Sequence, residues 1–240
     1  MAKGIELVAN MMVLDEALFI PEVLPRLQEL CDRVIIRDNG STDGTIELCE
    51  GLLRKGKDIL IKGMQDDPID YARLRNDMLW KVGYGEWVLK WDADELPSDG
   101  MMENLKSYIE NRQDEGGFTV PCYHIMKEPR MCLPIEVGWG HMCLFKMAQG
   151  MNYAGRIHEQ INAKGRISTI NPDSGIAIIH FSYFAEKRFK KKADQYAVLP
   201  GSGFSHSAQL TSRLSLKTVP LPDYINYTAD WDWLMKVKES

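Results

Sequence analysis

The sequence predicts an α/β protein with a mixed sheet, whose first half is mostly parallel and whose two faces are both covered by helices. The chain has 240 residues and 45% hydrophobic content, enough for one sizeable core. Up to about residue 95, short apolar runs alternate with amphipathic stretches, as in repeated β-α units. Beyond Pro97 this rhythm changes. We therefore expect one globular unit with elaborations.

The first half contains four predicted strands and three predicted helices. The strands are the apolar or β-branched runs Ile5–Ala9, Arg33–Arg37, Asp58–Ile61 and Glu86–Trp91. Helical spacing of apolar residues marks Ala17–Leu30, Thr42–Leu53 and Ile69–Val82. Because ligands of such sheets gather at the carboxyl ends of the strands, we expect the chemistry just after Arg37 and just after Trp91.

The second half predicts strands built onto this sheet. A helix over Met101–Arg112 precedes strands near Gly117–Pro121, His141–Lys146, Arg166–Ile170 and Ala177–Phe181, and a further helix is expected over Glu186–Val198. Residues 200–240 have no clear period, so we expect a C-terminal extension that serves as a lid, an acceptor surface or an interface.

Composition narrows the class of protein. A formal net charge of −5 gives no reason to expect nucleic acid as a partner. No run reaches the roughly 18 apolar residues that a transmembrane helix needs, so any membrane contact would be peripheral. The five cysteines form no C-x-x-C pair, and we expect buried reduced thiols and a cytoplasmic location.

A turn of small and acidic residues follows the second predicted strand. Asp38 lies at the carboxyl end of that strand, where a carboxylate can accept hydrogen bonds from a base or a ribose. Ser41 or Thr42 can cap the next helix. One alternative is a capped β-α connection without a ligand. Another is a calcium loop of the EF-hand type, whose spacing is matched by Asn39, Ser41, Asp43, Gly44 and Glu50. That loop requires a preceding helix, whereas a strand is predicted here.

Three carboxylates within four positions end the fourth predicted strand. Side chains alternate along an extended strand, so Asp92 and Asp94 can point the same way and share one divalent cation. Carboxylate oxygens suit Mg²⁺ or Mn²⁺, and a cation with few protein ligands leaves positions for diphosphate oxygens. The alternative is an acidic strand end that is merely solvated.

Taken together, these motifs resemble the family 2 glycosyltransferases, especially small bacterial and phage-borne ones. The resemblance rests on Asp38-Asn-Gly-Ser-Thr-Asp-Gly-Thr45, Arg75-Asn76 and Trp87-Val-Leu-Lys-Trp-Asp-Ala-Asp-Glu95 and spans roughly residues 5–185. It implies a GT-A, Rossmann-like domain over residues 1–199, with a nucleotide-binding half to about residue 97 and an acceptor half from 98. The implied reaction is metal-dependent, inverting transfer of a sugar from a nucleotide-diphosphate sugar, with a UDP-sugar favoured. The acceptor would be a hydroxyl of a saccharide, a lipid-linked molecule or a protein.

The resemblance also implies roles for single residues. Asp38 and Arg75 would contact the nucleobase or its ribose, Asp92 the ribose or the metal, and Asp94 the metal. Arg156-Ile-His158-Glu159-Gln resembles the element that supplies the catalytic carboxylate, so Glu159 is expected to be the base, and His180 is expected to complete the metal or diphosphate site. Arg75 could instead be an exposed helix charge, and His180 a core histidine. The segment Ala9–Glu16 departs from the commoner family pattern.

Two other functions also combine a nucleotide pocket with this sequence pattern. A nucleotidyltransferase normally has a glycine-rich basic loop after its first strand, and the segment from Asn10 to Glu16 is neither glycine-rich nor basic. A non-catalytic nucleotide-sugar-binding protein would not need the acidic pair, although its presence does not exclude that class.

Overall fold

The structure is a computed structural model that describes residues 4–64, 69–133, 140–156, 159–181, 183–184, 187 and 218–240. The strands are β1 (Leu7–Val13), β2 (Arg33–Asp38), β3 (Ile59–Ile61), β4 (Trp87–Asp92), β5 (Glu95–Pro97), β6 (Glu115–Met126), β7 (Glu128–Cys132), β8 (Gly140–Lys146), β9 (Tyr153–Ala154), β10 (Gln160–Ile161), β11 (Arg166–Thr169), β12 (Ile178–His180) and β13 (Val219–Pro220). The helices are α1 (Ile20–Leu30), α2 (Thr45–Leu52), α3 (Tyr71–Leu79), α4 (Asp99–Glu110), the short 3-10 helix η1 (Pro172–Ser174) and α7 (Trp231–Glu239).

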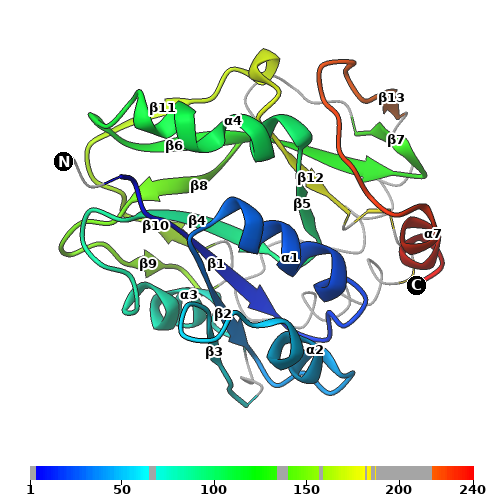
Figure 1. Cartoon of the computed structure of the whole chain (residues 1–240), viewed down its shortest axis with the longest axis horizontal. Helices are drawn as coiled ribbons and strands as arrows, with labels where there is room; N and C mark the ends of the chain where they lie inside the picture. Colours follow the sequence, from blue (N-terminus) through cyan, green and yellow to red (C-terminus); the bar gives the residue numbers. More distant parts are fainter. Residues whose placement is uncertain are drawn as a thin grey trace.

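One large mixed sheet organises the chain (Figure 1), in the order β13-β7-β6-β8-β4-β1-β2-β3. The first four strands pair in parallel, β1 with β2 and β4, and β2 with β3. From β4 onwards the direction alternates, because β8 is antiparallel to both β4 and β6. The predicted mixed sheet with a parallel first half is confirmed.

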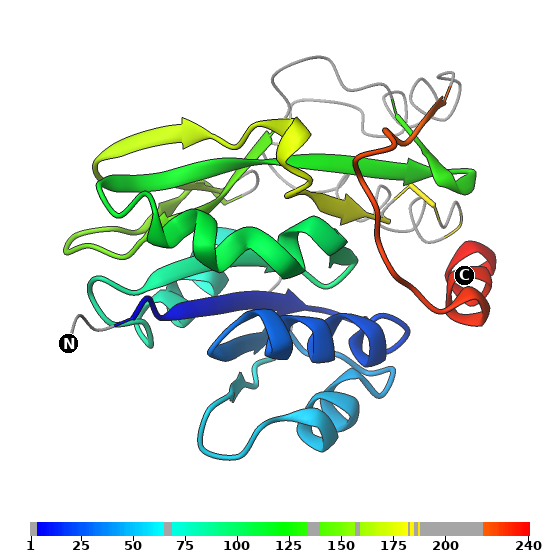
Figure 2. The same cartoon turned by 45° about the horizontal axis from the view of Figure 1, so that its top comes forward.

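Helices cover both faces of the parallel strands. Alternation along β1 sends Leu7 and Met11 into the core that contains α1, and Val8 into a second core that contains residues of α3. Figure 2 shows α1 and α2 stacked on the same side of β1. The two-faced arrangement explains why the strands are apolar on both sides, as parallel strands usually are.

The long strand β6 joins the two parts of the sheet. It pairs with β8 and β11 along its first part and with β12 and β7 along its second. The sequence predicted only its central Gly117–Pro121. The backbone at Lys164 lies so close to Gly116 that a Cβ added to this glycine would be 1.8 Å from the carbonyl oxygen of Lys164. Only glycine allows this approach of backbone to backbone.

The expected cap of α2 is wrong. The helix begins at Thr45 after Gly44, which has a positive φ of 95°, and neither Ser41 nor Thr42 caps it. Asp43 acts instead, because its Oδ1 accepts a hydrogen bond from the amide of Thr45 at 3.1 Å and its Oδ2 accepts one from the amide of Ala17 at 3.0 Å. The residue expected to start the first helix is thus held in a loop, and α1 begins at Ile20.

The end of the chain folds back onto the N-terminal half. Helix α7 lies at the end of the molecule towards which β1 points (Figure 2). The Trp233 indole donates to the carbonyl of Leu18 at 2.8 Å, and its ring packs edge-on against Phe19 and Phe181. This part of the extension therefore completes the core. The helix expected over residues 186–198 lies, except for Lys187, outside the described residues. None of the helices in the described part of the chain is long and apolar enough to cross a membrane.

Candidate active site

Arg75 lies at the centre of the candidate site. It projects from α3, whose first turn is capped by the Asp70 carboxylate, and it is 1% exposed. Its guanidinium forms an ion pair with Asp92, and its Nε lies 3.3 Å from Oε1 of Glu159. Burial opposes its charge, but these two carboxylates raise the pKa of Arg75 above its ordinary value. The alternative of an exposed helix charge is wrong.

The same guanidinium also ties two strands to α3. It donates to the carbonyl of Trp91 at 2.9 Å and to that of Asn10 at 3.2 Å. Arg75 therefore fixes the end of β4 and the middle of β1 relative to the two carboxylates. Five donors in a planar fork make arginine suited to such a junction, whereas a lysine could not bind all four oxygens.

Asn76, the next residue on α3, positions the hairpin that carries Glu159. Its side chain donates to the carbonyl of Tyr153 at 3.0 Å and accepts from the amide of the same residue at 2.7 Å. Tyr153 belongs to β9, which pairs with β10 directly after Glu159. The sequence motif Arg75-Asn76 thus has two parts, one that binds the carboxylates and one that holds the backbone beside them.

Lys90 is a site residue that the sequence analysis missed. It lies on the same side of β4 as Asp92, and its Nζ is 3.4 Å from Oε1 of Glu159. A signal was present, because a lysine interrupts an otherwise apolar strand two positions before the first aspartate. Lys90, Asp92, Glu95 and His180 line one small pocket.

Asp92 and Asp94 do not lie on one extended strand, so the prediction that strand alternation points them the same way is wrong. The strand ends at Asp92, and Ala93 and Asp94 form a turn before β5. The two carboxylates are still close enough for Asp94 to disfavour ionisation of Asp92. They differ in environment, since the Asp92 side chain is 40% exposed and that of Asp94 only 5%.

The environment of Asp92 and Glu95 shifts their pKa values in opposite directions. Burial opposes ionisation of Asp92, yet Arg75 and Lys90 hold its pKa below the ordinary value. Glu95 accepts a hydrogen bond from the amide of Asp92 at 3.0 Å, and burial, followed by the charge of Asp92, raises the pKa of Glu95 to about 7.

Asp92, Ala93 and Asp94 are called the acidic turn below. His180 contacts this turn from β12, which lies between β5 and β6. Its Nε2 is 3.4 Å from Oδ1 of Asp94, and the amide of Phe181 donates to the carbonyl of Asp94 at 2.9 Å. Burial opposes protonation, but the Asp94 carboxylate raises the pKa of His180 well above its ordinary value. The histidine is therefore a partner of the acidic turn and not merely a core residue.

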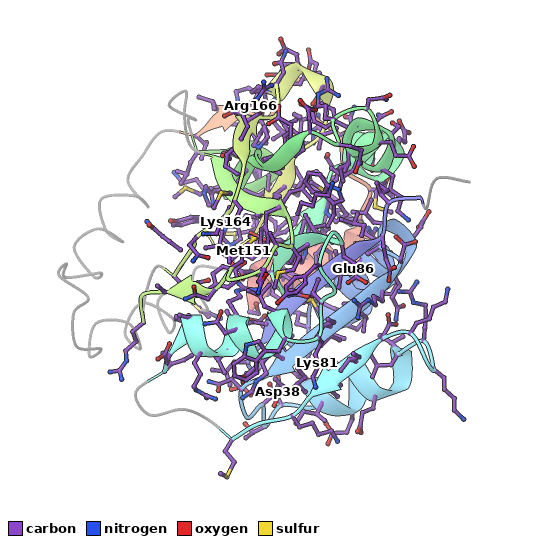
Figure 3. The ribbon with its side chains drawn as sticks, turned by 90° about the vertical axis from the view of Figure 1, so that its left-hand side faces the viewer. Asp38, Lys81, Glu86, Met151, Lys164 and Arg166 are labelled. Atoms are coloured by element: carbon purple, nitrogen blue, oxygen red, sulfur yellow. The ribbon has the colours of Figure 1, made fainter. Side chains whose placement is uncertain are left out.

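Asp38 makes its hydrogen bonds within its own turn. The carboxylate is fully buried and accepts from the amides of Gly40 at 2.8 Å and Ser41 at 3.2 Å. The preceding element is strand β2, so the EF-hand alternative is wrong. Figure 3 shows Asp38 in the N-terminal layer, at the opposite end of the view from Arg166. The nucleotide contact predicted for it stays a prediction.

Two buried side-chain amides, one in the middle of β1 and one just after β2, have unused hydrogen-bonding capacity. Asn10 on β1 is 1% exposed and Asn39 after β2 is 2% exposed. Neither side-chain oxygen nor side-chain nitrogen of either residue finds a partner among the described residues. Buried polar groups are normally satisfied, so these unpaired amides, of which Asn39 lies at the carboxyl edge of the parallel sheet, fit a site that binds a polar ligand. Of the predicted His158-Glu159 element, His158 lies outside the described residues.

The family model for glycosyl transferase family 2 matches residues 11–186 of the chain. The chain belongs to this family. It is therefore a glycosyltransferase, which answers the nucleotidyltransferase alternative. No curated protein matches the sequence significantly.

The fold of this glycosyltransferase is similar to that of S. aureus TarS. A crystal structure of TarS 1-349 matches with a TM-score of 0.54 and 14% identity, covering 88% of this chain and 70% of that one. The complex of TarS 1-349 with UDP-GlcNAc matches with a TM-score of 0.52 and 13% identity, covering 88% and 71%. The likeness confirms the GT-A architecture that the resemblance implied.

Proposed function

We propose that this family 2 glycosyltransferase transfers a sugar from a UDP-sugar to an acceptor hydroxyl with the help of a divalent cation. One observation carries the proposal: Arg75 binds both Asp92, at the acidic turn, and Glu159, the expected base. In sugar transfer the donor diphosphate and the acceptor hydroxyl must lie close together. Arg75 holds the carboxylate proposed for the donor side, Asp92, next to the one proposed for the acceptor, Glu159. The TarS complexes with UDP and with UDP-GlcNAc support the choice of nucleotide.

The acidic turn has a donor set that fits Mg²⁺ or Mn²⁺. Asp94 Oδ1 and His180 Nε2 lie 3.4 Å apart, a spacing that one cation with bonds of about 2.0–2.2 Å can bridge. The more exposed Asp92 offers a further carboxylate on the open side. When bound, the cation would neutralise charge that grows on the departing diphosphate, as metal ions do in comparable sites.

The nucleoside is proposed to lie between the middle of β1 and the end of β2. Asn10 and Asn39 offer the unused amide groups, and Asp38 the carboxylate, for a base and its ribose. Arg75 was expected to contact the nucleobase or ribose itself. Because Nε and both terminal nitrogens of Arg75 already bind protein oxygens, we propose that it acts through Asp92.

Glu159 is proposed to accept the proton of the acceptor hydroxyl. The hydroxyl oxygen then forms a bond to the anomeric carbon from the face opposite the diphosphate, while the bond from that carbon to the diphosphate oxygen breaks with its electron pair. The products are the inverted glycoside and UDP. Arg75 and Lys90 hold the Glu159 carboxylate in place at 3.3 and 3.4 Å, and a positioned base commonly supplies a factor of about 10²–10⁴ in rate.

The five cysteines are free and buried in the structure, which supports the proposed cytoplasmic location. The acceptor is proposed to be a saccharide, a lipid-linked molecule or a protein, in line with the family resemblance.

Release of UDP from a panel of UDP-sugars with Mn²⁺ and candidate acceptors tests this function. Glu159→Gln should lose about 10²–10⁴ in rate and keep donor affinity in calorimetry. Asp94→Ala should lose the affinity for donor that depends on Mn²⁺. Glu128→Gln is the control, because this exposed residue on β7 forms its ion pair with Lys238 of α7. Wild-type turnover in Glu159→Gln would remove it from the base role, and donor binding without release in any mixture would favour a non-catalytic binding protein.

A further inference from the structure

A second group of metal-binding side chains lies beside the acidic turn. Cys122 and His124 are two residues apart on β6, so they project from the same face of the strand. His180 lies directly opposite His124 in the parallel pairing of β12 with β6. One potential ligand atom from each of these three residues lies within 4.8 Å of the other two.

The two histidine rings are close to the spacing of a tetrahedral metal site. Nδ1 of His124 and Nδ1 of His180 are 2.9 Å apart, and the Cys122 sulfur lies within 4.8 Å of a nitrogen of each ring. Tetrahedral zinc with Zn–N bonds of about 2.0–2.1 Å and a Zn–S bond of about 2.3 Å places its ligand atoms roughly 3.3–3.6 Å apart. If the two rings moved apart by a few tenths of an ångström, the ion would fit between their nitrogens.

The second nitrogen of His180 is already oriented as in known zinc sites. Histidines that bind a metal through one nitrogen usually donate the other N–H to a carboxylate, which fixes the ring and its tautomer. Here Nδ1 faces His124, and Nε2 lies 3.4 Å from Oδ1 of Asp94. The pattern of carboxylate, histidine and metal position is complete within the described residues.

We propose that Cys122, His124 and His180 form a second metal site, which binds Zn²⁺. This site is distinct from the one proposed for Mg²⁺ or Mn²⁺ at Asp92 and Asp94. Thiolate and imidazole ligands select zinc over Mg²⁺ or Mn²⁺, which prefer carboxylates and water. Three protein ligands leave the fourth tetrahedral position open to water.

The proposed site has a consequence for the acidic turn. A neutral imidazole has only one unprotonated nitrogen. A His180 ring that binds zinc through Nδ1 therefore carries its proton on Nε2, and this N–H donates a hydrogen bond to Asp94. In that state His180 does not bind the Mg²⁺ or Mn²⁺ ion, which Asp92 and Asp94 would hold without it. His180 is the one residue that both proposed metal sites would use, whereas Cys122 and His124 take no part in the proposed sugar transfer.

Cobalt binding to the full chain tests the proposal, since Co²⁺ replaces Zn²⁺ and reports its ligands by colour. The metal-free, reduced protein is titrated with Co²⁺ alone. We expect one equivalent to produce a thiolate-to-cobalt charge-transfer band together with the intense visible bands of tetrahedral cobalt, and one equivalent of Zn²⁺ to remove both. Cys122→Ser should abolish the charge-transfer band, and His124→Asn should lower cobalt affinity at least tenfold.

Cys49→Ser is the matched control, because Cys49 is equally buried but lies on α2. It should keep the full spectrum. Absence of the charge-transfer band in the wild-type protein would overturn the proposal, whatever the variants do. Persistence of the band in folded Cys122→Ser would overturn it as well. UDP release with Mn²⁺, measured on the same samples, reports on the proposed function separately.

Discussion

Replacement of Arg75 by methionine tests whether this residue holds the site together. The change keeps most of the side-chain volume but removes the guanidinium that Asp92 and Glu159 share, so that Glu159 keeps only its contact with Lys90 at 3.4 Å. The side chains of Arg75 and Glu159 are only 1% and 9% exposed, whereas that of Asp92 is 40% exposed. Removing one partner of a buried ion pair costs about 3–5 kcal/mol. Solvent screens the pair with Asp92, so we expect the lower end, a loss of about 3 kcal/mol.

Urea unfolding followed by tryptophan fluorescence measures this loss, and thermal unfolding should show a Tm lowered by about 6–12 °C for a chain of this size. Arg73→Met is the control on the same helix, since its side chain is 46% exposed and its ion pair with Asp77 spans 3.5 Å; it should cost about 0–1 kcal/mol. Equal losses in the two variants would refute the central role of Arg75.

Three further changes probe the fold. The Asp58 carboxylate, whose burial opposes ionisation, is held by Arg54 at a pKa below the unfolded value of about 3.8. Between the folded and the unfolded pKa of Asp58, the unfolded state binds more protons, so the free energy of unfolding should fall as the pH drops below about 3.8. The fall should be smaller in Asp58→Asn, as measured by urea midpoints across pH. Trp233→Ala should cost about 3 kcal/mol and speed amide exchange in α7; unchanged exchange would show that the indole does not anchor the helix. Gly116→Ala should cost about 1–3 kcal/mol in urea, whereas Gly51→Ala, with open space around its Cβ position, should not destabilise the protein.

The parallel half of the fold was predictable because its signals are local. Apolar runs near Arg33–Arg37 and Glu86–Trp91 became β2 and β4 with shifts of one residue at most at each end. The first strand was the exception, since it runs on to Val13 where the sequence predicted an end at Ala9. Polar Asn10 within that strand hid its length, and its buried amide belongs to the candidate site.

The grouping of the site depended on contacts that the sequence does not show. Arg75 and Asp92 were both predicted, but their ion pair and the link to Glu159 follow from the packing of α3 on the sheet. Cys122 and His124 were missed because their partner, His180, lies on a strand that is distant in sequence. Pattern analysis finds carboxylates at strand ends more readily than ligands assembled across strands.

Helix α7 was missed although a signal for it exists. Asp230 caps the helix by accepting from the amide of Trp233 at 2.8 Å, and Trp233, Leu234 and Val237 form its buried side. An acidic cap followed by this spacing predicts a helix. The surrounding glycines, prolines and aromatics obscured it.

The insertion of β12 between β5 and β6 has a consequence for the order of folding. Strands β1 to β4 can pair through short β-α connections, whereas β12 must close a loop that spans most of the second half of the chain before it meets β5. Long-range pairings of this kind form slowly, because the entropy of loop closure precedes the gain from contacts. We therefore expect strands β1 to β4 to pair before β12 brings His180 to β5 and to the turn that carries Asp94.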